Sequence, residues 1–220
     1  MQKKNILVFD FDGTIVNSTE LEHTALLNTI HEYGFSDITK DNLECYFGPT
    51  ESGILKNILG EDNFPEAWAY FIEDYLRLQD TLLKRIPGMD QLLKDLSLRK
   101  DILLVLVTGR SKETCDISLS YLGYDNYFSK VYTGSDEGIN KGDNMNLLIE
   151  NYGVQKHNII YIGDTVADIK TLSQEGIDIL SVSYSEFEKS RKEELEELNP
   201  GNVVHTVEEL RTRLFALIEE

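Results

Sequence analysis

Three short apolar runs most constrain how this chain can fold. They span residues 5–9, 102–107 and 158–162, and each is largely Ile, Leu, Val or aromatic without alternating polar positions. Strands of this kind are covered on both faces, as in a parallel sheet that lies between helices. Weaker runs of the same type lie at residues 127–132, 177–182 and 203–204.

Helix-like segments stand between these runs. They cover residues 111–122, 144–152, 165–175 and 206–218. A strand followed by a helix, repeated along the chain, is typical of a doubly wound α/β domain. We therefore predict a Rossmann-like parallel sheet core.

The interval from residue 18 to residue 85 breaks this rhythm. It contains no convincing strand but at least two amphipathic helical patterns, one ended by Gly34 and one ended before Pro87. The second pattern carries an aromatic stripe, which favours the core of a small helical bundle over a surface that stacks ligands. We predict an α/β core made of residues 1–17 and 86–220, with residues 18–85 inserted as a helical cap.

Acidic residues outnumber basic ones, 39 to 21, which gives a formal net charge of −18. A field of that sign repels the phosphate backbone of nucleic acids, and no stripe of Lys and Arg opposes it. We therefore expect no nucleic-acid partner. A phosphate-bearing substrate would have to be attracted by cations close to its binding site.

Cysteine usage and the first apolar run indicate the compartment. Cys45 and Cys115 are far apart and outside any metal-ligand spacing, so neither a disulfide framework nor a zinc site is suggested. The first run is too short for a signal peptide or a membrane span. We predict a soluble cytoplasmic protein without a membrane partner, and the sequence indicates no oligomeric state.

The first apolar run leads into Phe-Asp-Phe-Asp-Gly-Thr, residues 9–14. Because side chains on a strand alternate, Asp10 and Asp12 can both face the crevice in which open α/β sheets bind ligands. Two such carboxylates repel each other unless a cation lies between them or one keeps a proton, so we expect Mg²⁺. Gly13 would let the chain turn sharply and let a ligand approach the backbone. A surface turn would not need four buried apolar residues before it.

Two further positions carry groups suited to phosphate. Thr108 and Gly109 follow the second apolar run, where a hydroxyl and backbone N–H groups that open a helix make an anion pocket. Lys141 lies just ahead of a helix and could supply local positive charge. Taken singly, the first pattern is also a common helix start, and a lone lysine is usually solvated surface.

The third apolar run leads into Gly163-Asp164, and Asp168 follows one helical turn later on the same face. Carboxylates are the expected ligands of Mg²⁺, which usually takes one or two of them and keeps its waters. Both residues could also be N-terminal helix residues favoured by the macrodipole.

In chain order, Asp10-x-Asp12-Gly-Thr, Thr108, Lys141 and Gly163-Asp164-x-x-x-Asp168 resemble the four motifs of the haloacid dehalogenase-like hydrolase superfamily. The helical interval between the first two motifs resembles the cap of its phosphoglycolate phosphatase-like group. The resemblance spans nearly the whole chain. It implies a Mg²⁺-dependent phosphatase whose substrate is a small phosphorylated metabolite.

The resemblance also implies a role for each residue. Asp10 would be the nucleophile that forms a phosphoaspartyl intermediate, and Asp12 the general acid for the leaving alcohol and then the base for water. Thr108 and the Gly109 amide would hold the phosphoryl group, and Lys141 would pair with it and with Asp10. The Asp10 carboxylate, the Asp12 carbonyl and Asp164 would hold the metal, with Asp168 supporting them from outside.

Several positions depart from the commonest form of these motifs. Asn17 stands where an aspartate often follows, Gly142 replaces a proline, and Gly109-Arg110 replace a more usual polar pair. None of these changes removes a catalytic group.

The roles of three cap and loop features stay open in the sequence. The loop from Tyr46 to Glu51 resembles a substrate-facing Gly-x-Pro region, and would either select the leaving group or form a helix–helix turn followed by the N-cap Thr50. Arg110 and His23 could reach the leaving group, although a surface arginine and a cap-packing histidine are the more ordinary interpretations.

Two other functions compete with the phosphatase. A phosphosugar mutase of the same fold would return the phosphate to a sugar hydroxyl, and a catalytically weak phosphate-binding protein would act in regulation. Phosphoglycolate, a sugar phosphate, a nucleoside monophosphate and pyrophosphate are all open as substrates.

Overall fold

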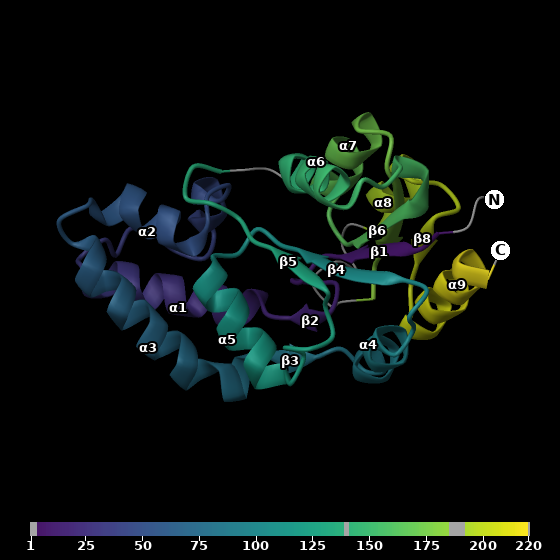
Figure 1. Ribbon diagram of the computed structural model, residues 1–220. Coiled ribbons are helices and arrows are strands. Elements are labelled where there is room, and N and C mark those ends of the chain that lie inside the picture. Colours follow the sequence, from purple (N-terminus) through teal and green to yellow (C-terminus); the bar gives the residue numbers. More distant parts are fainter. Residues whose placement is uncertain (1–3, 139–140, 185–191, 220) are drawn as a thin grey trace.

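A six-stranded parallel sheet forms the centre of the protein (Figure 1). The computed structural model describes residues 4–138, 141–184 and 192–219. The strands lie in the order β5-β4-β1-β6-β7-β8. Their bounds are Ile6–Phe9 (β1), Leu103–Val107 (β4), Lys130–Tyr132 (β5), Ile159–Gly163 (β6), Asp178–Val182 (β7) and Val203–Val204 (β8). This order confirms the predicted doubly wound α/β fold, and each predicted strand overlaps an observed one.

Helices cover both faces of the sheet (Figure 1). One face is covered by α6 (Lys141–Tyr152), α7 (Val166–Gln174) and α8 (Lys192–Leu198), and the other by α4 (Met89–Ser97), α5 (Lys112–Leu122) and α9 (Val207–Glu219). Along β1, Ile6 and Val8 pack into the first layer, while Leu7 and Phe9 pack into the second. Burial on both faces is the reason that β1 reads as a continuous apolar run.

Local signals set where several helices begin. The Ser111 hydroxyl caps α5 by accepting a hydrogen bond from the Thr114 N–H at 3.3 Å. Thr165 and Asp168 form a capping box at the start of α7. Helix α6 begins at Lys141, three residues before the predicted start at residue 144. None of the described helices combines the length and apolar content needed to cross a membrane.

Three helices form a bundle beside one end of the sheet (Figure 1), namely α1 (Thr19–Glu32), α2 (Glu51–Leu59) and α3 (Phe64–Leu82). Along α3 the rings of Phe64, Trp68, Phe71 and Tyr75 follow one another at centroid distances of 5.9, 5.1 and 5.8 Å. Phe71 and Tyr75 are fully buried. The aromatic stripe is therefore packed in the interior of the bundle, as predicted.

Sequence patterns missed α4, α8 and a short ribbon, and they indicated α2 only as one of two interpretations of the loop before it. In this ribbon β2 (Val16–Asn17) pairs antiparallel with β3 (Lys84–Arg85). The interval 18–85, predicted to lack strands, therefore contains β3 at its end. The ribbon lies at both predicted borders of the cap. The division of the chain at those borders stays a prediction.

The start of α2 contacts two loops of the α/β core. The Asp136 carboxylate, in the loop between β5 and α6, accepts hydrogen bonds from the Thr50 and Ser52 hydroxyls and from the Lys56 ammonium. The Glu51 carboxylate accepts from the Ser111 N–H at 2.7 Å, at the start of α5. These contacts hold the bundle against the core.

We predict that Asp136→Ala loosens α2. The change removes three hydrogen bonds to one charged group, so exchange of the α2 amides should speed up by about tenfold or more. Hydrogen–deuterium exchange measures this directly. Asp116→Ala is the control, because Asp116 is exposed and pairs only with Lys112 on its own helix. Equal exchange in wild type and Asp136→Ala would contradict the prediction.

Candidate active site

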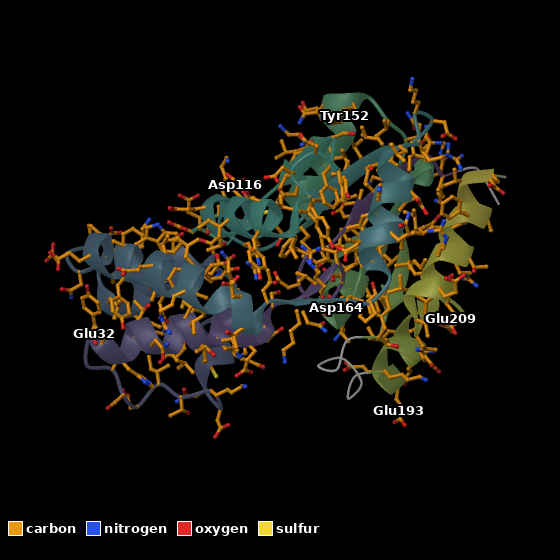
Figure 2. All side chains as sticks on the ribbon, turned by 90° about the horizontal axis from the view of Figure 1, so that it is seen from below. Glu32, Asp116, Tyr152, Asp164, Glu193 and Glu209 are labelled. Atoms are coloured by element: carbon orange, nitrogen blue, oxygen red, sulfur yellow. The ribbon has the colours of Figure 1, made fainter. Side chains whose placement is uncertain are left out.

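The order of the strands defines a crevice between β1 and β6. From β1 the chain moves to β4 on one side, whereas from β6 it moves to β7 on the other. Open α/β sheets bind ligands at the carboxyl ends of strands where the connections diverge in this way. Asp10 directly follows β1 and Asp164 directly follows β6. In the view of Figure 2, Asp164 lies between Glu32 at the end of α1 and Glu209 on the C-terminal helix α9.

Three buried carboxylates meet in this crevice. Oxygen atoms of Asp10, Asp164 and Asp168 lie within 4.8 Å of one another. Burial raises the pKa of Asp10 to about 7, because its effect exceeds the lowering effect of Lys141 and the Asp168 charge adds a smaller increase. When all three carboxylates are ionised, their negative charge exceeds the single positive charge of Lys141.

Lys141 is the cation that lies against this group. Its ammonium donates to Asp10 and lies 2.8 Å from Asp168 Oδ1. Only 20% of the Lys141 side chain is exposed, whereas a single lysine usually lies on the solvated surface. The position follows from the fold, because Lys141 begins the helix that leads into β6.

A magnesium ion fits the oxygen atoms of this crevice. Three carboxylates with one lysine leave a net negative charge, and oxygen donors of this kind suit a hard divalent cation. The side chain of Asp168 lies in the same group as those of Asp10 and Asp164 and also pairs with Lys141. Its role outside the metal's ligands stays a prediction.

Gly13 is required by the close approach of two loops. It has a φ of +72°, and a Cβ there would lie 2.1 Å from Asp164 Oδ2. The next residue, Thr14, donates its hydroxyl to Asp164 Oδ1 at 3.1 Å. The absence of a side chain at residue 13 therefore lets the Asp164 carboxylate reach the turn that follows β1.

The Asp12 carboxylate lies outside the group of three and pairs with Arg110. Arg110 Nε lies 3.0 and 2.9 Å from its two oxygens, and Nη2 lies 2.7 Å from Oδ1. The Ser18 hydroxyl also donates to Oδ1. Burial alone would raise the pKa of Asp12, but the adjacent guanidinium outweighs it and holds that pKa below its usual value.

Arg110 corrects the interpretation of a surface arginine. It is 2% exposed, packs over the Phe11 ring at 4.9 Å, and donates from Nη1 to the Tyr75 hydroxyl and to Ser118 Oγ. The neighbouring residues do not indicate this burial, because Asp12 and Tyr75 are distant along the chain. One signal was available, since Arg110 is the third residue after β4 and so lies at the sheet edge that carries Asp12.

Thr108 and Gly109 lie at the same edge of the sheet. Thr108 is buried, directly after β4, and Gly109 is exposed. The helix-opening N–H groups that follow are engaged, since that of Arg110 donates to Thr108 Oγ1 at 3.3 Å and that of Ser111 to Glu51. In the described part of the chain, no group accepts from the Gly109 N–H. The predicted anion pocket is therefore reduced to the hydroxyl and one amide.

The cap side of the site carries two carboxylates that sequence reasoning missed. Glu51 is buried and binds the start of α5. Glu22 of α1 has a pKa raised to about 8, first by burial and then by the charges of Asp12 and Glu51. His23 is buried beside Phe47, with ring centroids 5.3 Å apart, which agrees with a cap-packing histidine. Thr50 caps α2, as one of the two interpretations of its loop required.

Comparison with known proteins connects this geometry to a family. A family model described as haloacid dehalogenase-like hydrolase matches residues 7–182. The phosphoglycolate phosphatase of Aquifex aeolicus is 26% identical over 211 residues, which are 90% of this chain and 98% of that protein. The pyrophosphatase PpaX of Halalkalibacterium halodurans is 26% identical over 184 residues, 82% of this chain and 84% of that one.

Solved structures show the same fold. A haloacid dehalogenase-like hydrolase from Streptococcus pneumoniae superposes with a TM-score of 0.72 at 23% identity, and the match covers 96% of this chain and 98% of that one. At this identity the likeness concerns the fold alone.

We predict that Glu22 destabilises the folded protein increasingly as the pH rises. Its pKa is 4.5 without the fold and about 8 within it, so ionisation opposes folding from about pH 4.5 upward and reaches its full effect above about pH 8. Glu22→Gln stays neutral. The excess of its Tm over that of the wild type should grow from pH 5 to pH 8 in thermal unfolding with EDTA.

Glu20→Gln is the matched control, because Glu20 lies on the same helix, is exposed, and has its pKa lowered by the hydrogen bond from Lys40. Its Tm difference from the wild type should stay flat over the same range. A flat difference for Glu22→Gln as well would refute the prediction.

Proposed function

The chain belongs to the haloacid dehalogenase-like hydrolase family, and we propose that it is a Mg²⁺-dependent phosphatase that hydrolyses a small phosphate monoester through a phosphoaspartyl intermediate on Asp10. The observation that carries the proposal is the meeting of the Asp10 carboxylate with Lys141 and Asp164 where the sheet connections diverge. A buried nucleophile beside a cation is the arrangement that phosphoryl transfer needs.

The first step transfers the phosphoryl group to the protein. An Asp10 oxygen attacks phosphorus, the bond from phosphorus to the leaving oxygen breaks, and that oxygen takes a proton from Asp12. Lys141 offsets the negative charge on the phosphoryl oxygens. The Thr108 hydroxyl and the Gly109 amide supply hydrogen bonds to the same oxygens.

The second step releases phosphate. Asp12 accepts a proton from a water molecule as that water attacks phosphorus, and the bond between phosphorus and Asp10 breaks. Asp12 thereby regains the proton that it gave to the leaving group, and Asp10 is restored as a carboxylate.

The metal site would use the Asp10 and Asp164 carboxylates and the Asp12 carbonyl, with Asp168 beside them. When bound, Mg²⁺ would neutralise the crowded carboxylates and polarise a phosphoryl oxygen. The Asp12 side chain is not part of the three-carboxylate group, which supports its use in proton transfer instead of metal binding.

The substrate is best sought among the compounds named in the relatives. One relative is named a phosphoglycolate phosphatase and another a pyrophosphatase, so both compounds head a panel that also includes sugar phosphates and nucleoside monophosphates. Steady phosphate release from several esters without an activating bisphosphate would count against the phosphosugar mutase. An inactive wild type would favour the regulatory protein.

We expect Asp10→Asn to abolish hydrolysis of p-nitrophenyl phosphate. An amide cannot act as the nucleophile, so kcat should fall by about 10⁴-fold or more. Release of p-nitrophenolate in the presence of Mg²⁺ measures the rate. Asp116→Asn, at an exposed residue, should keep wild-type activity. A folded Asp10→Asn variant with substantial activity would exclude the phosphoaspartyl route.

Asp12→Ala should separate chemistry from metal binding. Its kcat should fall by about 10² to 10⁴-fold because the proton donor is lost. Its affinity for Mg²⁺ should stay within about threefold of the wild type, whereas Asp164→Asn should weaken binding by about tenfold or more. Isothermal titration calorimetry of metal-free protein gives both affinities. Loss of Mg²⁺ binding in folded Asp12→Ala would contradict the assignment.

A further inference from the structure

We propose that Arg110 is a positioning residue: it holds the Asp12 carboxylate in the orientation for proton transfer, and it is itself held by helix α3 of the bundle. The proposal rests on the function above, because it assumes that Asp12 transfers a proton. It assigns a task to a buried charge that the four motifs do not use.

The guanidinium fixes the carboxylate through two nitrogen atoms. Nε lies 2.9 Å from Asp12 Oδ2 and Nη2 lies 2.7 Å from Oδ1, so the two planar groups meet side by side. A single hydrogen bond would leave the carboxylate free to rotate, whereas this paired arrangement defines the plane of the carboxylate.

Arg110 is itself immobilised. Its remaining nitrogen donates to Tyr75 and, at 3.2 Å, to Ser118, and its face lies over the Phe11 ring. With 2% of its surface exposed and all three nitrogen atoms engaged, it is not available to bind a substrate directly. It therefore acts through Asp12 and contacts no reacting atom.

Two of the residues that set this arrangement come from the helical insertion. Tyr75 lies on α3, is fully buried, and also bonds Ser118 Oγ at 2.7 Å. Ser18 immediately precedes α1, and its hydroxyl binds Asp12 instead of capping that helix. Movement of the bundle away from the core would remove Tyr75 from Arg110, so the orientation of Asp12 is tied to the closed position of the bundle.

The leaving group provides the test. Phenolate is a much more basic leaving group than p-nitrophenolate, so phenyl phosphate depends more on a proton donor although the two esters have nearly the same shape. Loss of the guanidinium lets the pKa of Asp12 rise toward its usual value, which by itself would favour the protonated acid, but we expect the loss of orientation to dominate. For Arg110→Gln, kcat/KM should therefore fall by about 10²-fold on phenyl phosphate and by no more than about 10-fold on p-nitrophenyl phosphate. The ratio of the two values isolates proton transfer, because kcat/KM reports the steps up to departure of the leaving group.

Two further variants distinguish positioning from charge and from general damage. Arg110→Lys keeps the charge but loses the planar pair of donors, so its ratio should fall almost as far as that of Arg110→Gln. Arg99→Gln, at an arginine that pairs with the nearby Asp101, should leave both values unchanged. Full recovery of the ratio in Arg110→Lys would overturn the positioning role.

Tyr75→Phe tests the link to the bundle and replaces Arg110→Gln if that variant fails to fold in a thermal melt. It removes one hydrogen bond to Arg110 and keeps the ring, so the ratio should fall by about three- to fivefold. An unchanged ratio in Tyr75→Phe would overturn the link to α3.

Equal losses on both esters in folded Arg110→Gln, or an increase in activity, would overturn the proposal and leave the phosphatase intact. A wild type that hydrolyses neither ester would refute the proposed function itself.

Discussion

Crowding of negative charge at the carboxyl ends of β1 and β6 is the constraint on which the rest of the site depends. Asp10, Asp164 and Asp168 bring three carboxylates within 4.8 Å, where water is largely excluded. Such a group is stable only with cations beside it, and Lys141 supplies one charge. Gly13 belongs to the same constraint, because its missing side chain leaves room for Asp164. The packing of the sheet edge thus favours either a further cation or a retained proton at this position.

A second ion pair, between Asp12 and Arg110, lies beside this group and serves a different purpose. Lys141 faces Asp10, the proposed nucleophile, whereas Arg110 faces Asp12, the proposed proton donor, and reaches toward the helical bundle. In the proposed function, the two cations would divide the site into a metal and phosphate side and a leaving-group side. In a chain with a net charge of −18, both cations lie next to carboxylates of the crevice, so the local field differs from that of the whole surface.

Much of the fold could be predicted from the sequence, because burial on both faces gives the strands of a parallel sheet an unbroken apolar composition. Strands such as β1 and β6 carry that signal in the chain itself. Helices α2 and α4 give a weaker signal because each has only nine residues, although the apolar residues of α4 (Met89, Leu92, Leu93 and Leu96) do recur at helical spacing. Arg110 escaped for a different reason. Its partners Asp12 and Tyr75 are distant in sequence, so only the tertiary structure shows that it is buried.

The loops that receive α2 approach each other backbone to backbone. The Gly134 N–H donates to the Arg110 carbonyl at 2.8 Å, and a Cβ at residue 134 would lie 2.3 Å from the Gly109 carbonyl oxygen. These two loops carry Asp136 and Ser111, which hold α2. The bond between the two loops therefore couples both anchors of α2, so that a shift of either loop displaces Asp136 and Ser111 together.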